Sequence, residues 1–267
     1  MGDPYRVKPG QKVKLSDIDP RDTDALGSED EARGRLYLDA TAIDTLQDRL
    51  YAEGKRSLLV ILQGMDTSGK DGTVRGVFNT TGPLGVQVTA FRRPSEEEMA
   101  HDFLWRAHLA APRRGTIGIF NRSHYEDVLV VKVRKLVPAS DIEKRYDQIN
   151  AFEKMLTENG VTILKFMLHI SKAEQRERLQ ERLDDPKKHW KFNPGDLDDR
   201  KSWGDFMDAY ETMLHRCSTE WAPWRIVPAD RKWARNAVIA DVVRKTLEDM
   251  NPTYPKVSWD PKSIKIV

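Results

Sequence analysis

The sequence predicts an α/β fold with a parallel sheet of about five strands. Short apolar runs alternate with longer amphipathic segments along the 267 residues, and such alternation implies right-handed crossovers and a parallel sheet. An apolar content of 39% supports a substantial core. The first apolar run, Leu58 to Leu62, leads at once into a glycine-rich turn. Ligands of such sheets bind beyond the carboxyl ends of the strands.

The chain before this strand divides into an arm and a helix. Residues 1–28 are polar and contain three prolines, so we expect either an extended arm lying on the body or a disordered tail. From Glu29 to Glu53 the apolar residues form one helical stripe, and Gly54 provides a stop. We therefore expect an N-terminal arm at 1–28 and a single domain at 29–267.

A phosphate-binding loop follows the first strand, with the pattern Gly64-x-x-x-x-Gly69-Lys70. Glycines let successive backbone N–H groups turn toward one point, and the next helix presents its positive end there. Lys70 adds a full charge for the terminal phosphates. The hydroxyl residue that usually follows the lysine and holds magnesium is replaced by Asp71. Asp66 is therefore the first candidate to hold the metal.

The alternative is a glycine-rich turn with an incidental lysine. The strand before the loop and the helix-compatible run after it, Val74 to Asn79, favour phosphate binding. Further strands are predicted at 87–91, 116–120, 161–170 and 224–227, and helices at 95–110, 141–158, after Ser171 and at 231–250. Arg92-Arg93 and Asn121-Arg122 follow two of these strands, so three basic elements converge on one edge of the sheet.

The segment from about 174 to 222 is highly charged, and Pro186, Pro194 and Gly195 interrupt it. It is either an exposed helical hairpin or a lid that folds over phosphates. Phosphoryl transfer requires the exclusion of water, which favours a lid once a phosphate site is accepted. The candidate phosphate-binding residues of this lid are Arg178, Arg182, Lys187 and Lys188.

Two long motifs, GMDTSGKDG at 64–72 and FNRSHYED at 120–127, resemble the polyphosphate kinase type 2 family. The resemblance extends from about residue 5 to 250, and includes the KxxLSxIDP-like segment at 12–20, RRPSEEE at 92–98 and KFNPGDLDDRKSW at 191–203. It implies a P-loop kinase fold of the thymidylate-kinase type, a three-layer fold with a helical lid. It also implies Mg²⁺-dependent phosphate transfer between inorganic polyphosphate and nucleotides (with Mn²⁺ as a substitute), a cytoplasmic location and a homo-oligomer, dimer or tetramer.

Carried over to this sequence, the resemblance makes Asp66 and Lys70 the central catalytic pair and Arg122 a phosphate clamp. Asp127 becomes an acidic partner near the metal, which Asp66 would also bind. From the residues themselves, we predict that the phosphate loop, the basic track and the lid bind phosphate and polyphosphate through Gly64, Thr67, Ser68, Gly69, Asp71, Gly72, Thr73, Arg75, Arg93 and Arg178. Further candidates for a basic track are Arg92, Arg113 and Arg114.

Asn121 and Glu126 are expected to select the acceptor nucleotide. The HYEDV sequence after the NRS motif is most like the class III members of the family, which phosphorylate both AMP and ADP to give ADP and ATP. Two structural alternatives remain: Arg122 forms an ion pair with Glu126 or Asp127, or Glu126 only sets the rotamer of Arg122.

Two other functions remain open. One is an ATP-dependent nucleoside monophosphate kinase of the same fold; the other is a non-catalytic protein that binds polyanions or RNA. No RNA-binding signature is present, and we expect neither nucleic acid nor a membrane as a partner. The net charge is only +2, so a polyanion site depends on local clustering. The single cysteine, Cys217, excludes an internal disulfide and fits a reducing cytosol.

Overall fold

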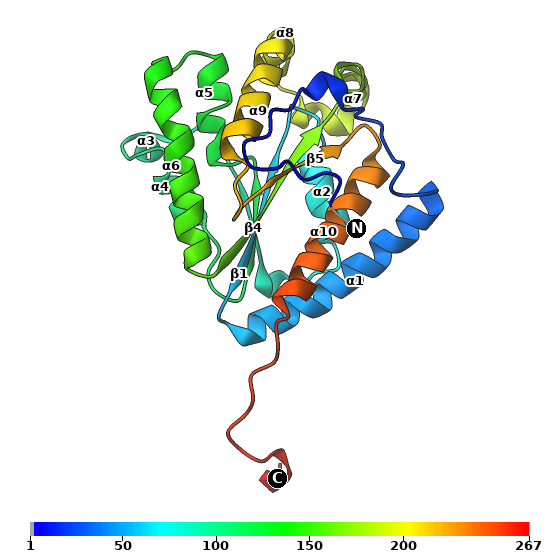
Figure 1. The fold of residues 1–267 in the computed structure, drawn as a ribbon. Coiled ribbons are helices and arrows are strands. Elements are labelled where there is room, and N and C mark those ends of the chain that lie inside the picture. The colour runs from blue at the N-terminus through cyan, green and yellow to red at the C-terminus, as the bar shows by residue number, and fades with distance from the viewer. Residues whose placement is uncertain (1–2, 267) are drawn as a thin grey trace.

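A parallel sheet of five strands forms the centre of the molecule in the computed structural model, which describes residues 3–266 (Figure 1). The order of the strands is β2-β3-β1-β4-β5, and all neighbours are parallel. The strands are β1 (Ser57–Gln63), β2 (Val86–Ala90), β3 (Ile117–Asn121), β4 (Val161–His169) and β5 (Trp224–Pro228). The predicted fold class, an α/β fold with a parallel sheet, is confirmed.

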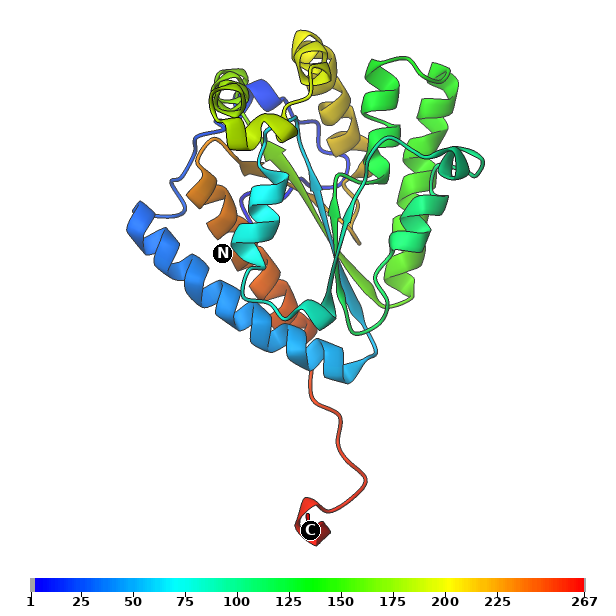
Figure 2. The same ribbon diagram turned by 180° about the vertical axis from the view of Figure 1, so that it is seen from behind.

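Helices cover both faces of this sheet and make a three-layer structure (Figures 1 and 2). One face carries α1 (Glu29–Glu53), α2 (Lys70–Val77) and α10 (Lys232–Met250). The other carries α3 (Glu96–Met99), α4 (Trp105–Ala110), α5 (Val130–Val133), α6 (Ala139–Glu158) and α9 (Trp203–Cys217). Above the carboxyl ends of the strands lie α7 (Lys172–Asp184) and α8 (Gly195–Lys201). Short 3₁₀ helices are η1 (Leu15–Asp17), η2 (Pro83–Gly85), η3 (His124–Asp127), η4 (Pro186–Lys191) and η5 (Pro261–Ser263).

The central strand β1 is buried on both faces, as its apolar run predicts. Leu59 and Ile61 belong to the core under α6 and α9, whereas Leu58, Val60 and Leu62 belong to the core under α1 and α10. This alternation follows from the period of two in a strand. The strand is therefore a rigid base for the loop at its carboxyl end.

The helix expected at 95–110 is interrupted. Ser95 and Glu98 form the predicted capping box at the start of α3, but α3 ends at Met99 and α4 begins only at Trp105. Between them the Asp102 carboxylate accepts a hydrogen bond from the Leu104 N–H at 2.9 Å. An aspartate that accepts from the backbone N–H two residues ahead in this way offers the chain an alternative to the helix.

The N-terminal arm lies on the body, as in the first of the two alternatives. Val7 and Leu15 are buried in the core, and Arg6 forms an antiparallel bridge with Arg225 at the outer edge of β5. The arm thus covers a sheet edge whose backbone groups would otherwise be unpaired. Within residues 3–266, no helix is both long and apolar enough to cross a membrane.

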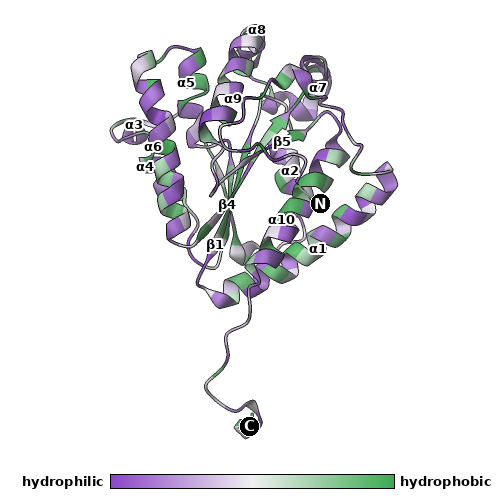
Figure 3. Cartoon of the chain, in the orientation of Figure 1, coloured by the Kyte–Doolittle hydropathy of each residue, from purple (hydrophilic) through white to green (hydrophobic). Residues whose placement is uncertain are grey.

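The lid is shorter than the segment 174–222. Helices α7 and α8 and the 3₁₀ helix η4 are mostly hydrophilic and stand above the sheet (Figure 3). Helix α9, in contrast, buries Phe206, Tyr210 and Leu214 in the core. These residues recur at helical spacing on one face, so the segment from Trp203 onward belongs to the body.

Candidate active site

The phosphate loop connects the end of β1 to the start of α2 at Lys70, and its two glycines are required. Gly64 has φ +153°, and a Cβ there would lie 2.7 Å from the Leu168 carbonyl oxygen. Gly69 has φ +101°, and a Cβ there would lie 1.8 Å from Nη1 of Arg235. Both backbone conformations therefore disfavour a side chain, and at Gly64 the Leu168 carbonyl oxygen also leaves no space for one.

Lys70 is buried beneath this loop. Its Nζ donates hydrogen bonds to the carbonyl oxygens of Gly64 at 2.7 Å and Met65 at 3.1 Å. Burial, together with the charge of Arg122, lowers the pKa of Lys70 to about 8. A phosphate arriving at the loop would compete with the two carbonyls for this ammonium group.

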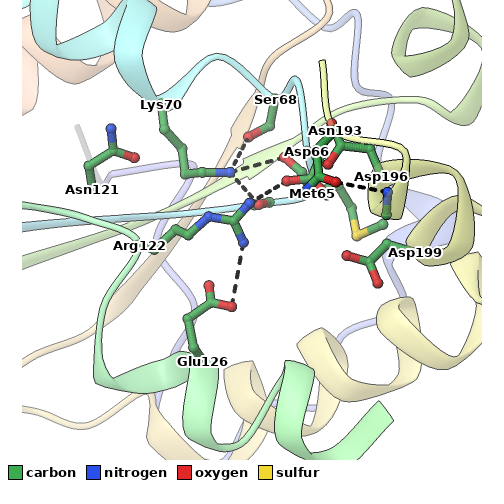
Figure 4. A network of polar contacts seen from close by, with 12 residues as sticks. Met65, Asp66, Ser68, Lys70, Asn121, Arg122, Glu126, Asn193, Asp196 and Asp199 are labelled. Atoms are coloured by element: carbon green, nitrogen blue, oxygen red, sulfur yellow. Dashed lines mark hydrogen bonds and ion pairs between the residues drawn. The ribbon is translucent and has the colours of Figure 1, made fainter. Parts of the chain in front are cut away.

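Arg122 lies between two carboxylates, Asp66 and Glu126 (Figure 4). Its Nη2 pairs with Asp66, and its Nη1 lies 3.5 Å from Oε2 of Glu126. Burial opposes the ionisation of Asp66, but Arg122 and Lys70 outweigh it and the pKa of Asp66 is lowered. Glu126, more than any other group, raises the pKa of Arg122. The cluster thus holds Asp66 as a carboxylate at the floor of the site.

Asp71 is held by the end of the neighbouring strand. The Asn121 amide donates a hydrogen bond of 2.6 Å to Asp71 Oδ1. Burial would raise the pKa of Asp71, but this hydrogen bond and nearby lysines lower it. The structure therefore joins the two motifs side by side, as expected from their positions at the ends of adjacent strands.

A cavity of about 500 Å³ opens above the loop. Eight of its lining side chains are Lys or Arg and four are Asp or Glu, which gives it a positive balance suited to a polyanion. The basic residues come from the loop, from two other strand ends, from the lid and from α10: Lys70, Arg92, Arg122, Arg178, Arg182, Lys188, Lys191 and Lys232.

The cavity brings together most of the expected site residues. Its lining includes Asp66, Thr67, Gly69, Lys70, Asp71, Gly72, Asn121, Arg122 and Arg178. Gly64, Ser68 and Thr73 are buried within the loop and the first turn of α2 and do not line it. Glu126 lines a small adjoining cavity on the other side of Arg122.

Several basic-track candidates lie elsewhere. Arg75 and Arg93 are exposed and outside the cavity, and Arg92 lines it instead. Arg113 and Arg114 precede β3. They therefore lie at the amino ends of the parallel strands, whereas the site lies at the carboxyl ends. In the lid, Lys188 lines the cavity and Lys187 does not.

Asp127 is directed away from the site, which corrects its expected place near the metal. Its carboxylate lies 3.3 Å from Arg106 Nη2 and 3.3 Å from Arg145 Nη1. Burial raises the pKa of Asp127 although both arginines oppose the shift. The 3₁₀ helix η3 places Glu126 and Asp127 on different sides, so Glu126 meets Arg122 and Asp127 joins α4 to α6.

Arg178 has a larger structural role than its expected phosphate contact. It is buried, and its guanidinium donates to the carbonyl oxygens of Thr67 at 2.9 Å and Asp230 at 2.7 Å. Its Nε pairs with Glu174 at 2.8 Å. The base of the lid is therefore attached directly to the phosphate loop.

Some lining residues were absent from the sequence-based set: Lys191, Asn193, Asp196 and Lys232. Lys232 follows the carboxyl end of β5 and opens α10, so its place at a strand end was a usable signal. No sequence signal identified the lid residues of this set, because their approach to the phosphate loop depends on the fold of α7 and α8.

Comparison with known proteins gives three concordant results. The family model of polyphosphate kinase 2 (PPK2) matches residues 26–255. The AMP/ADP-polyphosphate phosphotransferase of Meiothermus ruber is 50% identical, covering 94% of this chain and 95% of that protein. The ADP-polyphosphate phosphotransferase of Rhodopseudomonas palustris is 40% identical, covering 95% and 92%.

A crystal structure of a polyphosphate kinase 2 from Arthrobacter aurescens superposes with a TM-score of 0.92. It is 43% identical and the match covers 96% of this chain and 93% of that one. These matches extend over the phosphate loop, the lid and the core alike. The resemblance of the two motifs is thereby confirmed, and the chain belongs to the polyphosphate kinase 2 family.

Proposed function

We propose that this protein transfers the terminal phosphate of inorganic polyphosphate to AMP and ADP, giving ADP and ATP. The observation that carries the proposal is the basic cavity, which combines a phosphate loop with lysines and arginines of the lid. Phosphoryl transfer needs in-line positioning and positive charge around the moving group rather than a covalent nucleophile. The similarity to the Meiothermus ruber AMP/ADP enzyme supports the choice of both acceptors.

Each charged group of the floor has a task in this reaction. Lys70 and Arg122 hold the transferring phosphoryl group and stabilise the charge that develops on it. Asp66 orients the phosphate of the acceptor. Arg182, Lys188 and Lys191 of the lid bind the polyphosphate chain and close over it, which excludes water.

The donor set at the floor fits magnesium as expected for the family. Magnesium sites in kinases typically use one or two carboxylates and complete their coordination with phosphates and water. Asp66 supplies such a carboxylate, ionised and lining the cavity. Over residues 3–266 no group of three or more His, Cys, Asp or Glu side chains could hold a metal ion without substrate. Bound Mg²⁺, or Mn²⁺ with the same oxygen ligands, would neutralise phosphate charge.

The function is tested by product analysis with one donor and one acceptor at a time. We expect ADP from AMP and ATP from ADP when polyphosphate is the only donor. Turnover with ATP and none with polyphosphate would favour the ATP-dependent nucleoside monophosphate kinase. Binding of RNA without any transfer would favour the non-catalytic polyanion-binding protein.

Glu126 provides a prediction about the choice of acceptor. It accepts a hydrogen bond from Gln63 at 3.1 Å and lies 3.5 Å from Arg122, one side chain away from the main cavity. We propose that Glu126 holds water or metal that fills the space of the phosphate that AMP lacks. Glu126→Gln should therefore reduce kcat/KM for AMP much more than for ADP.

The matched control for this variant is Glu97→Gln, because Glu97 is exposed on α3 and outside both cavities. If Glu126 only orients Arg122, kcat/KM falls equally for both acceptors. An unchanged ratio of AMP to ADP activity would therefore reject the role in acceptor choice.

The lid lysines give a prediction about salt. Lys188 and Lys191 line the cavity from the 3₁₀ helix η4, whereas Lys187 on the same turn is exposed and outside it. Lys191→Gln should weaken polyphosphate binding and make it less dependent on salt. The slope of the logarithm of the binding constant against the logarithm of the salt concentration should change by roughly 0.7, if counterions are released as from single-stranded nucleic acid. Lys187→Gln should change neither. Equal slopes for the two variants would contradict the assignment of Lys191.

We further propose a cytoplasmic location and a homo-oligomer of two or four chains. The buried thiol of Cys217 suits a reducing compartment. Val88 of the edge strand β2 and Leu84 of the preceding 3₁₀ helix η2 are exposed, which provides apolar surface for association. Light scattering coupled to size-exclusion chromatography measures the number of chains.

A further inference from the structure

Arg235 of α10 is a buried cation directly beside the phosphate loop. Only 2% of the residue is exposed. Its Nη1 donates a hydrogen bond of 3.2 Å to the Ser68 carbonyl oxygen, and its Nε and Nη2 bond to Asn236. The guanidinium also occupies the space next to Gly69 and Gly72 where their side chains would be. Arg235 therefore packs against the loop from below, one turn after Lys232, which lines the cavity.

No carboxylate neutralises this guanidinium among the residues that the structure describes: none of the ion pairs includes Arg235. The charge that affects it most is that of Arg178, another buried cation. Burial, with this repulsion, lowers the pKa of Arg235 to about 10, so it stays protonated at neutral pH. A buried charge without a partner is unfavourable for folding, and its presence below an anion-binding loop calls for a functional reason.

The geometry of the peptide bond supplies one. In a trans peptide the carbonyl oxygen and the following N–H point in opposite directions. Because the Ser68 carbonyl points to Arg235, the Gly69 N–H points away from it, and Gly69 lines the cavity. Within the described part of the chain this N–H has no acceptor, whereas the neighbouring Ser68 N–H bonds to Met65. The arginine thus fixes the orientation in which the loop offers a donor to an anion.

We propose that Arg235 is a positioning residue for the polyphosphate chain. It holds the Ser68–Gly69 peptide with its N–H toward the phosphates, and the bound polyanion in turn neutralises the buried guanidinium. This role rests on the proposed function, since it requires a polyphosphate in the loop. Folding of the free protein tolerates an unpaired cation that substrate binding compensates.

A purely structural role makes different predictions. If Arg235 only packs α10 against α2, its replacement lowers the melting temperature of the free protein and leaves the affinity for polyphosphate unchanged. On our proposal, Arg235→Gln keeps a donor for Ser68 but removes the unpaired charge. The melting temperature of the free protein then stays the same or rises, and the additional stabilisation by polyphosphate decreases.

The experiment compares wild type, Arg235→Gln and Arg235→Lys, with Arg244→Gln as the matched control. Arg244 lies on the same helix but pairs with three carboxylates of Asp39, Asp241 and Glu248. We measure the melting temperature with and without polyphosphate, the Kd for polyphosphate at several salt concentrations, and KM and kcat. For Arg235→Gln we expect a Kd and a KM about tenfold higher, a size reasonable for one charge acting across a few ångströms of protein.

The salt dependence of Kd should also be weaker in Arg235→Gln, and kcat should change less than KM. Arg235→Lys should recover most of the affinity because it keeps the charge. Arg244→Gln should bind polyphosphate like wild type. A Kd for Arg235→Gln equal to that of wild type overturns the inference. If Arg235→Gln does not fold, Arg235→Lys decides. A higher Kd for polyphosphate than that of wild type, combined with a lower melting temperature of the free protein, would then overturn the inference. Failure of wild type to bind polyphosphate would count against the proposed function itself.

Discussion

Replacing Lys70 with Met is expected to reduce kcat/KM for polyphosphate-dependent transfer about a hundredfold to a thousandfold, the usual cost of one preorganised charged group at a developing charge. Lys70 is the buried cation of the phosphate loop, and Met retains much of its length. The fold should remain, because among residues 3–266 the ammonium forms hydrogen bonds only with loop atoms, at Gly64, Met65 and Ser68. Steady-state kinetics with AMP and ADP, together with circular dichroism, measure the two effects.

Asp66→Asn is the companion variant, since it removes the charge and keeps the shape. Its loss of activity should be similar, because Asp66 both pairs with Arg122 and lines the main cavity. Asp198→Asn is the control: Asp198 is exposed in the lid and pairs only with Lys201 within the described residues. Near-normal turnover of either site variant would contradict the mechanism.

Replacing Lys165 with Met is expected to lower the free energy of unfolding by about 3–5 kcal/mol, the cost of breaking a fully buried ion pair. Lys165 and Glu153 are both completely buried and lie 2.5 Å apart. The ammonium also donates to the Tyr125 hydroxyl at 2.8 Å and to the Cys217 carbonyl at 2.7 Å. Without Lys165 the Glu153 carboxylate would keep, among the described residues, the Tyr125 hydroxyl and the neighbouring His124. Urea unfolding measures the change.

The double variant Glu153→Leu with Lys165→Met separates the lost pair from the lost packing. Apolar residues of similar volume often replace a buried ion pair without loss of stability, so the double variant should be more stable than Lys165→Met alone. The exposed pair Lys245–Asp241 serves as a control, since its removal should change the free energy of unfolding by at most about 1 kcal/mol. A Lys165→Met protein within that range of wild type would contradict the expectation.

The pair also affects the site, because Tyr125 donates a hydrogen bond of 2.7 Å to Glu153 and directly precedes Glu126. The 3₁₀ helix that presents Glu126 to Arg122 is thereby attached to β4 and α6. A lysine in the middle of a mostly apolar strand was a visible signal that a buried partner exists. The identity of that partner was not visible.

Features that depend on neighbouring residues could be predicted from the sequence. The glycines of the phosphate loop are such a feature, because the backbone conformation they permit is set within a few residues. The five strands, the helical stripe of α1 and the capping box at Ser95 are others, since hydrophobic period and capping act over similarly short distances. The carboxyl ends of parallel strands lie at the same end of the sheet. This rule predicted that Asp66, Asp71, Asn121 and Arg122 lie close together.

Features that join distant segments were decided by the tertiary structure. The sequence predicted Asp127 near the metal, but in the structure it pairs with Arg106 and Arg145, which lie on two different helices. Arg235 donates a hydrogen bond to Ser68, which is 167 positions away in the sequence. Helix α9 was predicted to be part of the lid, but it packs in the core. An ion pair or a buried charge depends on which surfaces pack together, and that free energy is absent from any local pattern. The phosphate loop could therefore be predicted from its own residues. The distant side chains that contact it could be identified only from the tertiary structure.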